Sequence, residues 1–341
     1  MNDHDPAAIA ADPNWFPLRY DPARDEIHFA RLPREAHRSI SFLRDDKATQ
    51  APRATVARAA IRAHIQRGQP LHLILHSGLT GSTLLARALD REGMVMTWKE
   101  PPILTDIVRH RLMRPDPATA RAVLDDIAGL LARPFEPGET VIAKVASVGN
   151  GLGAEIARRS PETRILCLHA PLDIFLAGMA RKGLMGRLWG RKLFIGLHNA
   201  GLGALGFDDR ALFEQGDLQF AANAWLAMHR LFSAIAAEYG PERVRSFGSE
   251  QLFNDPQRAI AGIAAHFRSG IDAADLASEA LMARHAKTGE SYDPERRRRE
   301  LEQALTVHGE EITAIADWAR KVADVQGIAW TLPHPLELAP R

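Results

Sequence analysis

The chain has 341 residues, enough for one large α/β domain or two smaller ones. Lys and Arg together number 43 against 42 Asp and Glu, so a formal net charge of +1 gives no long-range field for attracting nucleic acid or an anionic membrane. The polar start of the sequence does not resemble a signal peptide, and no apolar run reaches the roughly 18 residues that span a bilayer. We therefore expect a cytoplasmic protein, and the Ala- and Arg-rich composition suggests a bacterial one.

The single cysteine, Cys167, lies in an apolar run and is expected to pack as a small hydrophobic residue.

Residues 1–50 are expected to form an N-terminal accessory segment. Two apolar stretches, at 15–18 and 27–30, lie on either side of a turn-prone stretch at 21–25. This arrangement predicts an extended piece or a hairpin. From 53 to 67 the pattern is helical, and it ends at Gly68.

Residues 51–290 alternate between strand and helix patterns. Short apolar runs without strict alternation predict buried parallel strands at 71–76, 94–98, 140–145, 163–169 and 243–247. Helical patterns separate them, at 83–91, 102–113, 117–132, 151–158, 172–182 and 217–239. We therefore predict a three-layer α/β/α domain around a parallel sheet of about five strands, with ligands at the carboxyl ends of the strands.

The later part of the chain is less regular in sequence. The segment 183–209 combines many glycines with large apolar side chains, and two interpretations stay open: a mobile lid or substrate-facing loop, and an irregular helical excursion in the core. Helical patterns follow at 256–267, 273–283 and 294–325. Residues 291–341 are expected to form a C-terminal helix and a surface tail. Four consecutive arginines at 296–299 are expected on a solvated helix face, paired with nearby glutamates.

The most informative stretch runs from the strand at 71–76 into the helix at 83–91. A buried strand that feeds a Gly-rich turn and opens a helix is typical of a phosphate cradle. Glycine lets the backbone approach the anion, and the helix end supplies N–H groups and the positive end of its dipole. A Walker A loop would place glycine at 76 and lysine at 82, but the sequence has His76 and Ser82 there.

The loop resembles the phosphosulfate loop of P-loop sulfotransferases, which reads Pro-Lys/Arg-Ser-Gly-Thr-Thr. Thr80, Gly81, Ser82 and Thr83 match it without gaps, whereas Gly78 and Leu79 stand where the proline and the basic residue should be. The stretch 84–90 is similar to the Leu-x-x-Ala/Met-Leu-Asp pattern of the branch that includes tyrosylprotein and other bacterial-type sulfotransferases. The stretch 249–256 looks like the family's Tyr-Glu-Asp-Leu and Asp-Pro segment.

The resemblance implies a reaction and its participants. The donor would be 3′-phosphoadenosine-5′-phosphosulfate (PAPS), with adenosine 3′,5′-bisphosphate (PAP) as product, and residues 78–83 would hold its 5′-phosphate side. The acceptor would be a hydroxyl of a small molecule or peptide, with no metal, nucleic acid or membrane taking part.

Glu100 stands where that branch has its catalytic glutamate, at the end of the strand after the loop. The resemblance implies that Glu100 is the base that takes the proton of the acceptor hydroxyl. The alternative is a structural ion pair or a cap before Pro101, which opens a helix. Lys99 and Lys144 end neighbouring predicted strands, and either could steady the bridging and leaving oxygens. Ala146 holds the position of the histidine base found in many sulfotransferases, which makes Glu100 the better candidate.

The resemblance also indicates where the 3′-phosphate of the donor would lie. His169 occupies the position of the family's arginine, and Arg284 and Lys287 lie where the family has a late basic loop that contacts this phosphate. Arg181, which closes the helix at 172–182, is a further candidate cation for the donor. For each arginine and lysine, a solvated surface charge is the alternative interpretation.

Two other functions remain open from the sequence. A P-loop kinase or NTPase would keep Thr83 as a Mg²⁺ ligand, although the Walker lysine is absent. A catalytically degenerate nucleotide-binding or regulatory protein would lose both the basic residue of the loop and the 3′-phosphate arginine. No Cys/His zinc pattern is present, so we expect no bound metal.

Overall fold

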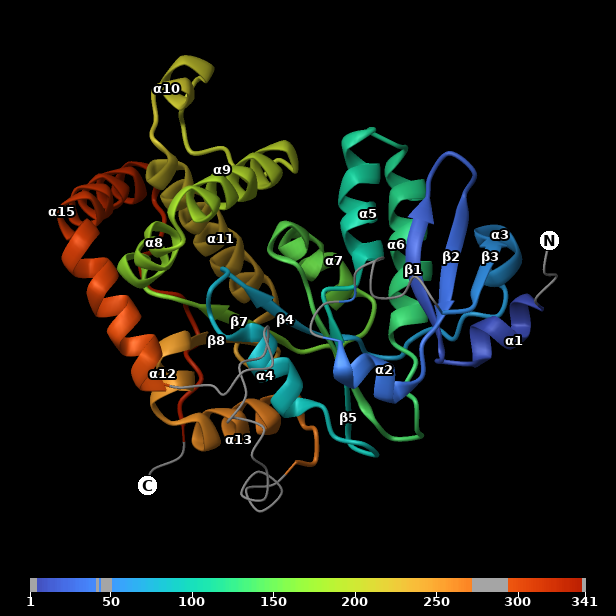
Figure 1. Cartoon of the computed structure of the whole chain (residues 1–341). Coiled ribbons are helices and arrows are strands. Elements are labelled where there is room, and N and C mark those ends of the chain that lie inside the picture. The colour runs from blue at the N-terminus through green and yellow to red at the C-terminus, as the bar shows by residue number, and fades with distance from the viewer. Residues whose placement is uncertain (1–4, 41–42, 44–50, 272–293, 339–341) are drawn as a thin grey trace.

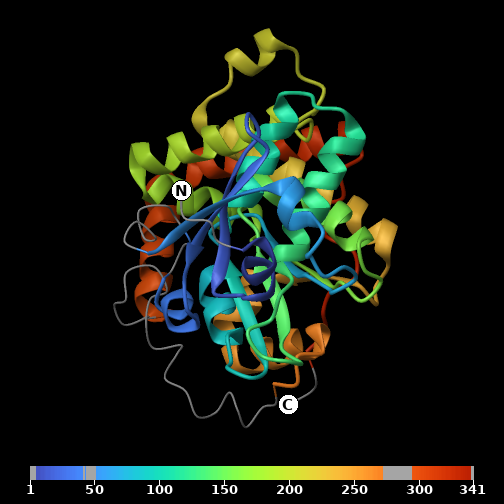
Figure 2. The ribbon, with the colours of Figure 1, turned by 90° about the vertical axis from the view of Figure 1, so that its right-hand side faces the viewer.

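The N-terminal part forms a small antiparallel sheet. The computed structural model describes residues 5–40, 43, 51–271 and 294–338. Strands β1 (Trp15–Asp21) and β2 (Glu26–Arg31) pair as a hairpin, which confirms the extended pattern, and β2 also pairs with β3 (Arg53–Ala57). Helices α1 (Pro6–Ala11), α2 (Arg34–Ser39) and α3 (Arg58–Arg62) accompany this sheet. Figure 2 shows it in front of the rest of the molecule.

The prediction of one helix over 53–67 is wrong. Residues 53–57 form β3, in which Ala54 and Val56 are buried and their neighbours are exposed. This period of two lets β3 extend the buried face of the hairpin, because Ala54 and Val56 pair with Phe29 and Ile27 of β2. Strand pairing therefore overrides the helical pattern. Only Arg58–Arg62 is helical. The small sheet thus extends past residue 50, and the domain boundaries themselves stay a prediction.

The main sheet has five parallel strands in the order β5-β6-β4-β7-β8. They are β4 (His72–His76), β5 (Val95–Lys99), β6 (Thr140–Lys144), β7 (Ile165–His169) and β8 (Val244–Gly248). Each coincides with a predicted strand to within two residues, so the predicted fold class is confirmed. The chain passes from β4 to β5, at one edge of the sheet, and from β7 to β8, at the other edge. Such a reversal opens a crevice at the carboxyl ends of β4 and β7, where ligands of α/β sheets bind.

Helices cover both faces of this sheet, giving three layers (Figure 1). Alternate strand residues face opposite ways: Ile74 and Leu166 pack in one apolar cluster, and Leu73 and Cys167 in the other. The first cluster includes α4 (Ser82–Leu89), α12 (Ser249–Asn254) and α13 (Pro256–Phe267). The second includes α5 (Pro102–Leu112), α6 (Pro117–Leu131), the 3₁₀ helix η1 (Ser147–Leu152), α7 (Gly153–Arg158), α8 (Leu172–Arg181) and α11 (Asp217–Tyr239).

The segment 183–209 is more ordered than either interpretation of its sequence. Residues Gly183–Asn199 form the regular helix α9, which buries Phe194 and Leu197. The short helix α10 (Asp209–Phe213) buries none of its residues and projects from the body in Figures 1 and 2.

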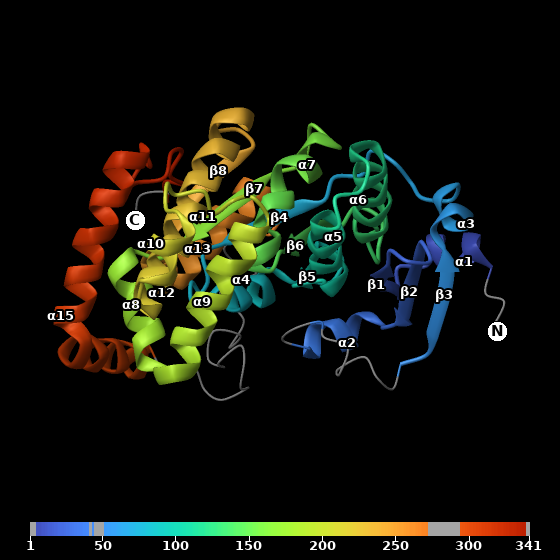
Figure 3. The ribbon, with the colours of Figure 1, turned by 90° about the horizontal axis from the view of Figure 1, so that it is seen from above.

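The C-terminal helix and the small N-terminal sheet lie at opposite ends of the molecule (Figure 3). Helix α15 (Pro294–Gln326) packs beside α8. The prediction of a loose surface tail is wrong in part, because the chain after α15 returns to the main sheet: Ser246 N–H donates to the His334 carbonyl at 3.0 Å, and Leu336 N–H donates to the Ser246 carbonyl at 2.8 Å. The predicted helix at 273–283 falls outside the described residues.

Candidate functional site

The loop between β4 and α4 adopts a backbone that most side chains disfavour. Gly78, Leu79 and Gly81 have φ values of +87°, +58° and +73°. Two of these positions are therefore explained by glycine, whereas Leu79 adopts a left-handed conformation that is uncommon for a leucine. Its side chain lies against Gly178 of α8, where an added Cβ would be 2.7 Å from a Leu79 methyl carbon. The residue at the family's basic position thus packs against a helix.

The start of the loop is held between neighbouring strands. Ser77 N–H donates to the Leu168 carbonyl of β7 at 3.1 Å, and Ala170 N–H donates to Ser77 Oγ at 3.2 Å. On the other side, the Asn150 side-chain amide of η1 donates to the His76 carbonyl at 3.0 Å. These bonds fix the loop in the crevice between β4 and β7.

The middle of the loop offers hydrogen-bond donors that the protein itself does not use. Thr80 is fully buried, and its Oγ1 has no hydrogen-bond partner among the described residues. Within the described part of the chain, no side chain caps the N-terminus of α4, which follows Gly81 directly. A buried hydroxyl without a partner and an uncapped helix start both favour an anion at this place. The loop therefore fits the phosphate group that the sequence predicts for it.

Glu100, Lys144 and His76 meet beside this loop, each from a different strand end. Glu100 has φ of +59°, and its N–H donates to the Lys144 carbonyl at 2.8 Å, so the residue just after β5 stays hydrogen-bonded to β6. The Lys144 ammonium forms an ion pair with Glu100 Oε1, and His76 Nε2 lies 3.8 Å from the same oxygen. Lys144 is 1% exposed and Glu100 is 26% exposed. The carboxylate is thus reachable from solvent, whereas the ammonium is not.

His76 links this trio to the loop. Its Nδ1 accepts a hydrogen bond from Gly78 N–H at 3.1 Å, and Ser147 Oγ lies 3.4 Å from the same nitrogen. A ring whose Nδ1 accepts carries its hydrogen on Nε2, the nitrogen that faces Glu100. His76 is therefore hydrogen-bonded to the loop backbone, and its Nε2–H lies near the Glu100 carboxylate without a hydrogen bond to it.

Lys99 is not part of this group. It pairs in register with Lys144 on the neighbouring strand, but its ammonium donates to the His37 carbonyl of α2 at 2.5 Å. Burial lowers the pKa of Lys99 to about 8, while the Asp90 carboxylate partly opposes that shift. Of the two lysines that the sequence predicts at the ligand edge, only Lys144 contacts Glu100.

The candidates for the 3′-phosphate are dispersed. His169 ends β7, packs edge-on against His229 and has its pKa lowered to about 4 by burial, so at neutral pH it is uncharged. Arg181 forms an ion pair with Glu300 of α15 and is exposed. Arg284 and Lys287 lie outside the described residues. Of the described candidates, His169 therefore carries no charge, and the charge of Arg181 is already paired with a carboxylate.

Two contacts around the loop have no clear signal in the sequence. An added Cβ at Gly81 would lie 2.7 Å from the Phe253 ring of α12, and the guanidinium of Arg297 stacks on that ring at 3.7 Å. Arg297 also pairs with Glu250 at 2.6 Å, which corrects the expectation that all four arginines at 296–299 are solvated. From α9, the Trp189 ring would lie 2.7 Å from a Cβ at Gly78.

No protein-family model and no curated protein matches this sequence. Among solved structures, the sulfotransferase domain of the curacin biosynthetic pathway is similar to this chain, with 16% sequence identity, a TM-score of 0.42, and coverage of 80% of this chain and 95% of that chain. A sulfotransferase from Alicyclobacillus acidocaldarius is 13% identical, with a TM-score of 0.37 and coverage of 76% of this chain and 98% of that chain. The sulfotransferase domain of the Synechococcus PCC 7002 olefin synthase is 16% identical, with a TM-score of 0.38 and coverage of 80% of this chain and 92% of that chain. At these values the likeness assigns neither a reaction nor a residue role to this chain.

The described residues contain no cluster of three or more His, Cys, Asp or Glu side chains that could hold a metal ion. None of their helices is long and apolar enough to cross a membrane.

Proposed function

We propose that this protein transfers a sulfuryl group from PAPS to a hydroxyl of a small molecule or peptide. The observation that carries the proposal is the meeting of Glu100, Lys144 and His76 beside residues 77–81. By resemblance, Glu100 would be the catalytic base. The ion pair with Lys144, the exposed side of the carboxylate and the position of His76 between it and the loop support that role. The assignment to the branch of the tyrosylprotein enzymes rests on sequence alone.

Donor binding would use groups that have no hydrogen-bond partner among the residues that the structure describes. Thr80 Oγ1–H and the first N–H groups of α4 would donate to the 5′-phosphate side of PAPS. Arg297, stacked on the ring that lies against Gly81, is a candidate for the positive charge that Leu79 does not supply. Trp189 would cover the loop from the side of α9.

In the transfer step, the acceptor oxygen forms a bond to sulfur while the bond from sulfur to the phosphate oxygen of the donor breaks. Glu100 takes the proton of the acceptor hydroxyl, and PAP leaves with the bond electrons. The Lys144 ammonium would move from Glu100 toward the negative charge that develops on the leaving oxygen. That movement would free the carboxylate at the moment at which it is needed as a base.

Nucleotide binding without transfer is the second candidate function. Two observations favour it. Leu79 stands at the basic position of the family's loop but packs on Gly178, and His169 is uncharged. A kinase or NTPase activity is distinguished from both by its requirement for Mg²⁺.

Calorimetry with PAP, ATP and GTP, with and without Mg²⁺, separates these functions. Tight, Mg²⁺-independent binding of PAP supports the proposal, and binding of ATP only with Mg²⁺ would replace it with phosphoryl transfer. Binding of PAP without release of PAP from PAPS, over a panel of alcohols and phenols, would leave the binding function alone.

Glu100→Gln tests the role of the carboxylate. We expect turnover to fall by roughly 10²- to 10⁴-fold. Affinity for PAP should be unchanged or higher, because the variant no longer competes for the Lys144 ammonium. The control is Glu311→Gln, which removes a carboxylate held by Arg187 on the surface and should leave turnover intact. A fully active Glu100→Gln protein would rule Glu100 out as the base.

A further inference from the structure

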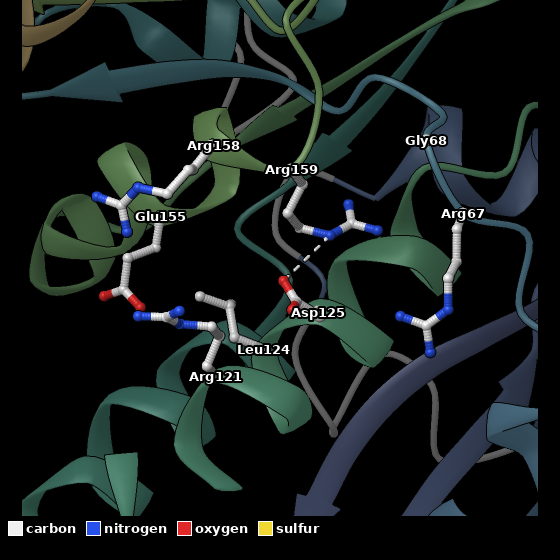
Figure 4. Close-up of a pocket in the computed structure, with 8 residues that line it drawn as sticks. All are labelled: Arg67, Gly68, Arg121, Leu124, Asp125, Glu155, Arg158 and Arg159. Carbon is white, nitrogen blue, oxygen red and sulfur yellow. Dashed lines mark ion pairs between the residues drawn. The ribbon is translucent and has the colours of Figure 1, made fainter. Parts of the chain in front are cut away.

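A groove lies near the amino ends of the strands of the main sheet, opposite to residues 77–81, which follow the carboxyl end of β4. It is bounded by α6, by the end of α7 and by the chain just before β4, and it encloses about 300 Å³. A second hollow of about 240 Å³ adjoins it and shares Arg121 and Glu155. Figure 4 shows that the first hollow is lined mainly by long charged side chains: Arg67, Arg121, Asp125, Glu155, Arg158 and Arg159.

The carboxylates in this groove already have arginine partners. Asp125 lies 3.5 Å from Arg159 (Figure 4), and both oxygens of Glu155 are bonded by the guanidinium of Arg111, at 2.7 Å for the Nη2 contact. Arg121 forms no ion pair with any residue in the described part of the chain, although its side chain lines both hollows. Of the other lining arginines, Arg67 lies 3.4 Å from Asp126 and Arg158 lies 3.3 Å from Glu238, so the excess of positive charge in the groove rests on Arg121.

Arg159 is built into the floor of the groove. Its side chain is 9% exposed, and its Nη2 would lie 3.3 Å from a Cβ at Gly129, so the missing side chain of Gly129 makes room for the guanidinium. Burial lowers the pKa of Arg159, and the nearby charge of Arg67 adds to that effect against the opposing Asp125. The guanidinium of Arg159, held in this partly buried place with the charge of Arg67 nearby, favours a bound anion.

We propose that this groove binds a small phosphorylated anion with two or more negative charges, such as a diphosphate. Guanidinium groups match phosphate oxygens with paired N–H donors, and the enclosed volume suits a small ligand. A ligand with a single carboxylate would have to displace Asp125 or Glu155 on equal terms, whereas a multiply charged phosphate could bind Arg121 and also compete with Asp125 for Arg159. This site is independent of the proposed transfer at residues 77–81.

Calorimetric titration of the full chain with inorganic pyrophosphate at low ionic strength tests the proposal. Arg121→Gln should weaken binding by about tenfold, the effect of losing one charge-assisted hydrogen bond. Asp125→Asn should tighten it, because Arg159 loses its internal competitor. Arg210→Gln is the matched control: its side chain is 87% exposed on α10, and the variant has the same loss of charge with no expected effect on affinity.

Thr80→Val distinguishes this groove from the loop after β4. Pyrophosphate affinity should not change in that variant if the anion binds between α6 and α7. Equal affinity in Arg121→Gln and wild type, loss of binding in Thr80→Val, or no binding by wild type at millimolar concentrations would each overturn the proposal. Tighter binding of a polyglutamate peptide than of pyrophosphate would also overturn it, in favour of an acidic protein segment.

Discussion

Thr80 offers a test in which stability and binding should change in opposite directions. Its Oγ1 is buried and has no hydrogen-bond partner among the described residues. A buried polar group without a partner costs about 1–3 kcal/mol, and valine has the same shape without the hydroxyl. Thr80→Val should therefore raise the free energy of unfolding of the free protein by about 1 kcal/mol or more. Urea titration followed by circular dichroism measures this change.

The same hydroxyl should matter for the nucleotide. If Thr80 Oγ1–H donates to a phosphate of PAP, its loss removes a hydrogen bond to a charged group, which contributes about 1.5–3 kcal/mol. Affinity for PAP should fall by about tenfold or more. Calorimetry on the two proteins gives this ratio, and the rise in melting temperature with added PAP should be smaller for the variant.

Thr97→Val is the matched control with the opposite sign. Thr97 is equally buried, but its Oγ1 donates to the Ala86 carbonyl at 2.9 Å and lies 3.1 Å from Asp90. Its loss leaves the Ala86 carbonyl without that donor in a buried place, and the protein should be destabilised by about 1–3 kcal/mol. The reasoning fails if Thr80→Val is destabilised as Thr97→Val is, or if Thr80→Val binds PAP as wild type does.

Three further variants test other parts of the structure. Gly81→Ala combines a left-handed φ with a Cβ 2.7 Å from the Phe253 ring, so urea titration should show destabilisation by about 1–3 kcal/mol, whereas Gly248→Ala, with open space around it, should be close to neutral. Burial lowers the pKa of His229 to about 3, below its value of 6.5 when unfolded; the unfolded chain therefore binds the proton first, stability is lost as pH falls from 6.5 toward 3, and His229→Phe should reduce that acid slope by about one proton. The pKa of Lys99 is lowered to about 8 from 10.5, so stability should rise with pH from 8 to 10.5 in wild type, and Lys99→Met should flatten that rise; an unchanged slope would mean that Lys99 is not buried in solution.

The elements of the main sheet could be predicted from the sequence because their signals are local. A short apolar run bounded by turn residues predicts a buried strand wherever its neighbours lie in space. The helical pattern at 53–67 is the instructive failure. Several of its residues are compatible with either state, and pairing with β2 made Arg53–Ala57 a strand.

The candidate site was predictable in part. Glu100 and Lys144 lie at the carboxyl ends of predicted parallel strands, so their place at one edge of the sheet followed from the pattern, whereas their contact depends on the pairing of β5 with β6. Lys99 has the same signal but a different environment, because α2 covers its strand and offers the His37 carbonyl. The contact of Arg297 with Phe253 joins segments that are far apart in the chain and had no local signal.

The sequence by itself determined the strand, the Gly-rich turn and the helix of the phosphate-type loop, since backbone conformation there depends on residues within a few positions of each other. Tertiary structure decided which charges act together. Lys144 pairs with Glu100, Lys99 is held by α2, and His169 loses its charge through burial. Arg121 lines the groove near the amino ends of the strands and forms no ion pair with any described residue. Each of these outcomes depends on the solvent and partners that surround a side chain after folding, and these are set by elements distant in sequence.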